Sequence, residues 1–218
     1  MASSAKTSST ATNVDRSSGQ EWLYLSNALT DDNNYALIEI PIAVGASDWA
    51  VFTNWGFSIS PLAVIDGIVF SYKAKSVTWT NEIYILDTRL WWNGDVTNTN
   101  PTYGAGGNYW TTTLSTFTFG SPSDKWGTDI LQSPGITLDP ATVNNSDFGV
   151  ATAVETGDVY GPSTFSGELY YVSMTIYYTI NGIRYGSTAI KDVRLGTTQV
   201  KNGFFGSNDL NTSELTLP

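Results

Sequence analysis

Short runs of alternating apolar and polar residues recur along this chain and constrain its fold more than any other feature. Ile38, Ile40 and Ile42 alternate with Leu37, Glu39 and Pro41, and the same period of two returns over residues 68–72, 84–92, 109–119, 148–152 and 170–178. Alternation of this kind is typical of a β-strand with one buried face, and no segment shows the 3.6-residue period of a helix. The sequence therefore predicts an all-β fold.

The residues between the alternating runs favour tight turns. Asn93-Gly94, Asn181-Gly182 and Asn202-Gly203 each provide the pair of residues that tolerates the positive φ angles of a two-residue hairpin. Pro41 lacks a main-chain N–H, which places its run at the edge of a sheet. Many short strands with such turns indicate an antiparallel β-sandwich with a small C-terminal β-hairpin appendage.

Three parts of the chain differ in composition. Residues 1–20 are rich in Ser and Thr and contain almost no large apolar side chain, so we expect an extended, flexible N-terminal arm. Residues 21–180 hold the strong alternation and form the sandwich. Residues 181–218 carry weaker runs at 190–195 and 199–201, which we interpret as the hairpin appendage.

Composition argues against several classes of function. The chain has 218 residues and a net charge of −10, which repels the phosphates of nucleic acids and anionic membrane surfaces. It contains no cysteine and no histidine, so the usual ligands of zinc and haem are missing and we expect no cofactor. No apolar run approaches the roughly 18 residues needed to span a bilayer.

Six short motifs stand out between Trp22 and Tyr178. They are residues 30–36 (TDDNNYA), 53–59 (TNWGFSI), 65–69 (IDGIV), 124–127 (DKWG), 147–150 (DFGV) and 172–178 (VSMTIYY). In this order and spacing they resemble a jelly-roll domain that recurs in structural proteins of tailed bacteriophages, over about three quarters of the chain. The resemblance implies that the β-sandwich is of jelly-roll type. One departure lies just before the closing strand, where the stretch of residues 168–171 (ELYY) replaces the usual acidic residue of the family.

The resemblance implies a non-catalytic structural protein located in the virion. Such a protein serves as a capsid decoration (cement) protein, as a head or tail fibre component, or as part of a baseplate. The partners it implies are the major capsid or tail proteins and further copies of the chain, in a homo-oligomer such as a trimer. The residues 193–201 (VRLGTTQVK) are similar to a hairpin near the ends of phage tail proteins.

A cluster of aromatic residues supports a second hypothesis, a carbohydrate-binding or receptor-binding module for a cell-surface glycan. Flat rings beside a polar loop can stack on sugar faces. Alternation along a strand directs Trp91 and Trp92 to opposite faces, so at least one of them is expected in the core. Packing in a core or an interface therefore remains the other interpretation of this group, which comprises Trp91, Trp92, Tyr103, Tyr109 and Trp110.

Acidic residues allow two further interpretations. Asp31, Asp32, Asp139 and Asp147 lie in loops rich in Asp and Asn, where their oxygens could bind Ca²⁺ or could stabilise turns through hydrogen bonds to the backbone.

A small glycosidase is the third hypothesis, because such an enzyme needs only two facing carboxylates. The candidate residues are Asp66, Glu82, Asp87 and Glu168, and the structural alternative for Asp87 is an ion pair with Arg89. A Ser-His-Asp or Cys-His mechanism is excluded by the absence of histidine.

Overall fold

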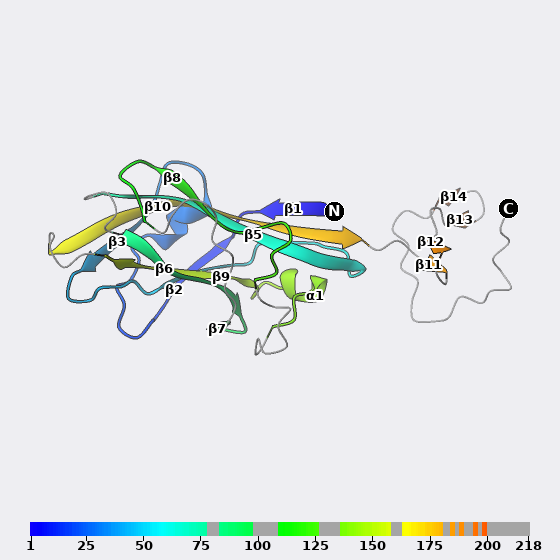
Figure 1. The fold of residues 1–218 in the computed structure, drawn as a ribbon, viewed down its shortest axis with the longest axis horizontal. Helices are drawn as coiled ribbons and strands as arrows, with labels where there is room; N and C mark the ends of the chain where they lie inside the picture. Colours follow the sequence, from blue (N-terminus) through cyan, green and yellow to red (C-terminus); the bar gives the residue numbers. More distant parts are fainter. Residues whose placement is uncertain are drawn as a thin grey trace. The chain divides into compact units, whose positions relative to one another are not determined.

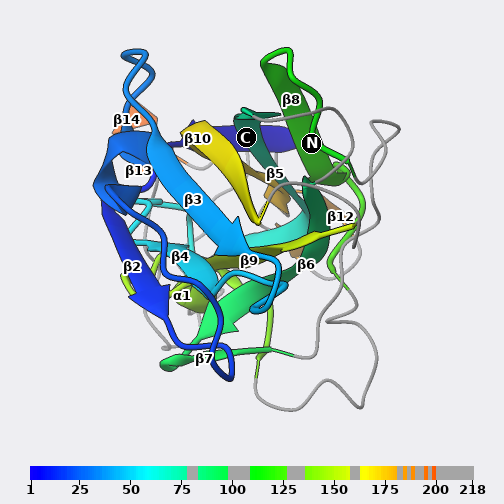
Figure 2. The same ribbon diagram turned by 90° about the vertical axis from the view of Figure 1, so that its left-hand side faces the viewer.

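In the computed structural model, the chain forms two compact units, residues 1–180 and residues 181–218. The structure describes residues 1–77, 83–97, 109–126, 136–157 and 163–180, and four short strands beyond residue 180. The first unit is built from two five-stranded sheets (Figures 1 and 2). We name them sheet A and sheet B.

Sheet A is centred on its two longest strands. β10 (Thr164–Ile180) pairs along most of its length with β5 (Ala63–Ser76), and β5 pairs on its other side with β8 (Ser115–Gly120). The free side of β10 is shared by β3 (Ala36–Pro41) and β1 (Ala2–Lys6), which pair with its two halves. All of these pairs are antiparallel, and β3 is an edge strand, as Pro41 predicts.

Sheet B has the order β2-β4-β9-β6-β7. Its strands are β2 (Thr10–Val14), β4 (Trp49–Thr53), β6 (Ile83–Trp92), β7 (Asp95–Val96) and β9 (Gly149–Thr156). Asn93 and Gly94 connect β6 to β7 with φ angles of 53° and 81°, which are the positive angles that this dipeptide predicts. Figure 2 shows β3, β8 and β10 above β4, β7 and β9, so the two sheets form separate layers.

Helical structure is limited to two short segments in the described part of the first unit. A 3-10 helix, η1 (Leu25–Leu29), precedes β3, and a single helical turn, α1 (Pro140–Val143), precedes β9. The all-β, antiparallel sandwich that the sequence predicts is confirmed. Its jelly-roll character stays a prediction.

The core between the sheets contains many aromatic rings. Trp110 is 1% exposed and its ring centroid lies 6.3 Å from that of Trp22 and 6.0 Å from that of Tyr72. Isoleucines 38, 40 and 68 are fully buried in the same cluster. Burying a large apolar side chain contributes about 1.5–3 kcal/mol, so these alternating positions supply the main driving force for the sandwich.

The N-terminal residues do not form the flexible arm that composition predicts for residues 1–20. β1 pairs antiparallel with β10 from Ala2↔Tyr178 to Lys6↔Met174, and β2 pairs with β4. The expectation is wrong because a strand can be held by main-chain hydrogen bonds, which require no apolar side chain. The same segment thus contributes one strand to each sheet.

The second unit begins at Asn181 and contains two short hairpins in its backbone. β11 (Arg184–Tyr185) pairs with β12 (Thr188–Ala189), and β13 (Arg194–Leu195) pairs with β14 (Thr198–Gln199). The turns Asn181-Gly182 and Asn202-Gly203 lie outside the described residues.

Candidate functional site

The aromatic residues predicted as a sugar-binding platform do not form one surface. Trp110 lies in the core between the sheets, where it contacts Tyr72 and Phe117, and it is only 1% exposed. The expected strand over residues 109–119 begins only at Ser115, while Trp110 donates its main-chain N–H to Ile83 O and turns inward. A buried ring cannot stack on a sugar, so this residue is removed from the candidate site.

The remaining members of the platform are dispersed. Trp91 packs in a small cluster with Trp49 and Ala151, whereas Trp92 packs against the main core, so the two rings occupy opposite faces of sheet B. This is the division that strand alternation predicts. Tyr109 is 48% exposed and contacts Tyr84 at 5.6 Å between ring centroids. Tyr103 lies outside the described residues.

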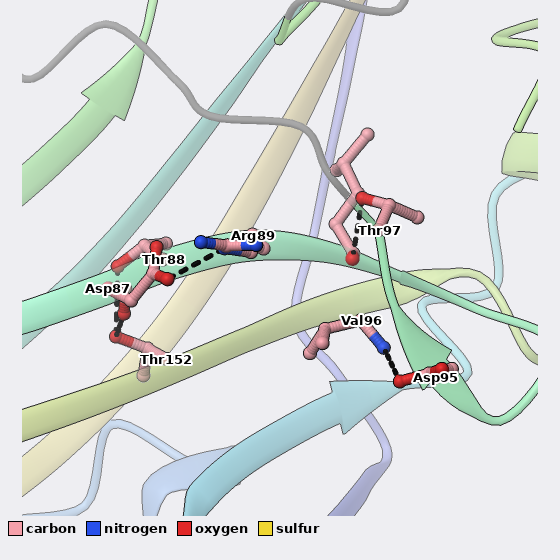
Figure 3. Close-up of polar contacts among 8 residues, drawn as sticks. Asp87, Thr88, Arg89, Asp95, Val96, Thr97 and Thr152 are labelled. Atoms are coloured by element: carbon pink, nitrogen blue, oxygen red, sulfur yellow. Dashed lines mark hydrogen bonds and ion pairs between the residues drawn. The ribbon is translucent and has the colours of Figure 1, made fainter. Parts of the chain in front are cut away.

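The candidate carboxylates of a glycosidase also have other partners. Figure 3 shows Asp87 beside Arg89 on β6, where Nε of the guanidinium lies 2.6 Å from Asp87 Oδ2. The structural alternative for Asp87 is therefore confirmed. Thr88 and Thr152 face the interior next to this pair, with their hydroxyl oxygens 3.0 Å apart (Figure 3).

Asp66 and Glu168 are too far apart to act as a catalytic pair. Glu168 pairs with Lys75 across the strands, and Lys75 lies nine positions along β5 from Asp66, which is about 30 Å at the rise of a strand. Glycosidase carboxylates lie only about 5–9.5 Å apart. Asp66 instead accepts a hydrogen bond of 2.6 Å from the Thr179 hydroxyl, and Glu82 lies outside the described residues.

Three of the four aspartates considered for calcium have a structural partner for the carboxylate, and the fourth, Asp147, takes part in a turn through its main chain. Asp139 caps the start of α1 by accepting from Thr142 N at 2.8 Å, and Asp31 pairs with Lys73. Asp32 accepts from Asn34 N at 3.0 Å, and this hydrogen bond lowers the pKa of the Asp32 carboxyl. Asp147 donates its main-chain N–H to Asn145 Oδ1. Among the described residues, no group of three or more acidic side chains is placed to hold a metal ion.

A different surface gathers aromatic and charged side chains on the outer face of sheet A. We call it the tyrosine face, and its residues are Asp31, Tyr35, Lys73, Lys75, Glu168, Tyr170 and Tyr171. The register of β10 against β5 shifts between Leu169 and Tyr171, so Tyr170 is the extra residue of a β-bulge. Because of the bulge, two consecutive tyrosines both face outward instead of alternating.

One half of the tyrosine face is a hydrogen-bonded triad. Lys75 Nζ lies 2.9 Å from Glu168 Oε2, and the Tyr170 hydroxyl donates to the same oxygen at 2.6 Å. The Glu168 side chain is only 10% exposed. Hydrogen bonding to Glu168 raises the pKa of the Lys75 ammonium, and burial together with the Glu168 bond raises the pKa of the Tyr170 phenol. Near neutral pH the lysine is therefore charged and the tyrosine is a hydrogen-bond donor.

The other half repeats the pattern at the surface. Lys73 Nζ lies 2.7 Å from Asp31 Oδ2 and 5.7 Å from the centre of the Tyr171 ring. Tyr35 is 38% exposed, and its ring centroid lies 5.4 Å from that of Tyr170. Two ammonium groups and two carboxylates balance in charge, so this face suits an uncharged polar ligand or a polar protein surface.

Sequence reasoning found only Glu168 and Asp31 of this face, and it assigned each to another role. The pattern from Tyr170 to Tyr178 predicts that Tyr170 shares the buried face of Val172, whereas the bulge places it on the opposite face. The two adjacent tyrosines within residues 168–171 (ELYY) were the available signal.

No protein-family profile matches the sequence, and no curated protein or solved structure is significantly similar to it. The functional argument therefore rests on the residues of this chain. In the described part of the chain, no helix has the length and apolar character required to cross a membrane.

Proposed function

We propose that this chain is a non-catalytic structural protein of a bacteriophage virion, a capsid decoration (cement) protein or a head or tail fibre component that assembles with neighbouring subunits. The virion assignment derives from the sequence resemblance to the phage jelly-roll domain. The structural observation that supports an assembly role is the position of β1 at the edge of sheet A.

The edge formed by β1 is suited to a contact between subunits. β1 pairs on one side with β10, and the described residues place no strand on its other side. The outer N–H and C=O groups of an edge strand can pair with a strand of a neighbouring chain. Its side chains are small or polar, from Ala2 to Lys6, which opposes indiscriminate aggregation while permitting main-chain pairing.

Light scattering of the purified chain over a wide range of concentrations tests the assembly role. The expected result is a mass of three or more times the 23.6 kDa of one chain, or a monomer that binds to empty capsids or tails. A mass of one chain at every concentration, without binding to either particle, would contradict the proposal.

The tyrosine face supports a second candidate function, recognition of an uncharged glycan on a cell surface. The observation that favours it is the bulge that turns the half-buried Tyr170 and Tyr171 to the same outer face, beside fixed ammonium and carboxylate groups. Sugar sites combine flat rings with polar groups of defined position.

A glycan array with two variants tests this second function. Replacement of Tyr170 and Tyr171 by Ala should reduce binding about tenfold or more, because tenfold corresponds to about 1.4 kcal/mol and each aromatic contact contributes about 0.5–1.5 kcal/mol. Tyr109→Ala is the matched control, because Tyr109 is an exposed tyrosine that contacts Tyr84 of sheet B. Equal binding by both variants, or no glycan bound by the parent chain, would rule the function out.

A further inference from the structure

We propose that β1 exchanges between copies of this chain, so that β1 of one copy pairs with residues 174–178 of β10 in another. The inference rests on the proposed assembly function and names its partner, a second copy. It follows from the different ways in which β1 and β2 are attached to the sandwich.

β1 is attached through its main chain. Its five residues pair with β10 in an unbroken antiparallel register, and four of them are exposed, with only Ser4 half-buried. In the part of the chain that the structure describes, the β1 side chains make no hydrogen bond, ion pair or ring contact. Main-chain pairing of this kind is the same whether the strand belongs to the same copy or to a neighbour.

β2 is attached through side chains as well. The Asn13 amide donates to Trp22 O at 2.8 Å, and its carbonyl oxygen accepts from Trp22 N at 2.9 Å. Just after β2, Arg16 N donates to Asp48 Oδ1 at 3.0 Å, and the Arg16 guanidinium lies 5.2 Å from the centre of the Trp49 ring. These contacts fix β2 to its own sandwich, so the segment that can exchange ends before it.

Ser8 forms the boundary between the two strands. It is 3% exposed, and its hydroxyl oxygen lies 2.7 Å from Thr10 O and 2.5 Å from Thr53 O. Ser9 adds a hydroxyl contact of 2.9 Å to Asn54 O. Because the chain is anchored here, residues 1–7 can swing about this point while sheet B keeps its edge strand. An extended segment of seven residues reaches about 25 Å, which is enough to cross to an adjacent sandwich.

Exchange would also leave a suitable acceptor on every copy. When β1 leaves, the main-chain groups of β10 from Met174 to Tyr178 lose their partner. An open edge of this kind can be satisfied by an identical strand from a neighbour. Each copy both donates and accepts one strand, so the arrangement can form a closed ring or extend along a lattice.

Engineered cysteines provide a direct test, because the natural chain contains none. Ala5 lies opposite Thr175, and opposed strand residues have the Cα separation that a disulfide requires. The variants Ala5→Cys and Thr175→Cys are prepared separately as full chains, mixed under conditions in which assembly occurs, and oxidised. A disulfide between the two variants forms efficiently only when β1 of one copy lies on β10 of another.

A third variant provides the collision control. Thr118→Cys places an exposed thiol on β8, on the other side of β5, where exchange does not bring Ala5. Residues held in register have an effective concentration in the millimolar range, so at micromolar protein the Ala5–Thr175 pair should cross-link about a hundredfold more than the Ala5–Thr118 pair.

The outcomes separate this inference from the proposed function. Preferential Ala5–Thr175 cross-links between chains support exchange. Oligomers by light scattering with cross-linking no greater than the control overturn exchange and leave the assembly function in place. A monomer without such cross-links overturns exchange, and it overturns the assembly function as well when the chain also fails to bind empty capsids or tails. The double variant Ala5→Cys/Thr175→Cys checks the register, because it should close an internal disulfide in any copy that retains its own β1.

Discussion

Replacement of Glu168 by Gln tests how the tyrosine face contributes to stability. The substitution preserves the shape of the side chain and an oxygen that can accept from Tyr170, but it removes the charge that pairs with Lys75 at 2.9 Å. A hydrogen bond to a charged group contributes about 1.5–3 kcal/mol. Because the Lys75 side chain is 31% exposed, water compensates in part, and we expect a loss of about 1–2 kcal/mol.

Asp31→Asn is the matched control on the same face. It also removes the carboxylate partner of a lysine, but the Asp31 and Lys73 side chains are 55% and 37% exposed. Exposed ion pairs contribute about 0.2–1 kcal/mol, so this variant should lose clearly less stability than Glu168→Gln. Burial of the carboxylate is the main difference between the two lysine–carboxylate pairs.

Denaturant unfolding followed by tryptophan fluorescence measures both variants. All eight tryptophans precede residue 181, so the signal reports on the sandwich unit. The expected loss for Glu168→Gln corresponds to a fall in Tm of about 3–6 °C for a domain of this size. Equal losses in the two variants, or a larger loss for Asp31→Asn, would refute the argument from burial.

The dependence of the unfolding free energy on pH provides a second measurement on the Glu168→Gln variant. The pKa values of Lys75 and Tyr170 are raised above their ordinary values of 10.5 and 10.0. The stability that these groups contribute is therefore complete below about pH 10 and is lost as pH rises through their folded pKa values. Glu168→Gln should make this alkaline loss smaller, because Glu168 is the main cause of the Lys75 shift.

Three further predictions address other parts of the sandwich. Gly120→Ala should lower the free energy of unfolding by about 2–4 kcal/mol, because Gly120 has φ of +78° and an added Cβ would clash with Ile68 O. Gly45→Ala should lower it by only about 1–2 kcal/mol, because Gly45 has a similar φ of +77° but open space around the added Cβ. Burial and the hydrogen bond to Glu155 raise the pKa of Tyr84 to about 12, so an ultraviolet titration should show a late-ionising phenol near that pH that Tyr84→Phe removes. The stability linked to that phenol should fall between about pH 10 and pH 12. Trp110→Ala should cost about 3–5 kcal/mol in denaturant unfolding, and an unfolding free energy close to that of the parent would contradict its place in the core.

The sandwich could be predicted because burial and alternation are expressed directly in the sequence. In β3, the isoleucines at 38 and 40 are fully buried and Glu39 between them is exposed, as the pattern predicts. The N-terminal strands could not be predicted in this way. Their pairing uses main-chain groups that every residue carries, so β1, with the sequence ASSAK, leaves no apolar signal.

The candidate site was less predictable, because it depends on strand register and on which distant segments pack together in the folded chain. The bulge at Tyr170 reverses the face of a residue that alternation assigns to the interior. Trp91 and Trp110 are close in sequence, but one packs on sheet B and the other between the sheets. The role of Asp139 could have been inferred from the sequence, because aspartate is a favoured N-cap residue and proline is favoured at the first position of a helix.

Quantitative mass spectrometry of purified virus particles tests the central claim most directly. The particles are purified from cells that express the chain, and its peptides are counted relative to those of the major capsid protein. A virion structural protein should be present at a fixed number of copies in intact particles and should remain after washing at high salt. Absence of its peptides from particles, while they are abundant in the cell lysate, would contradict the account.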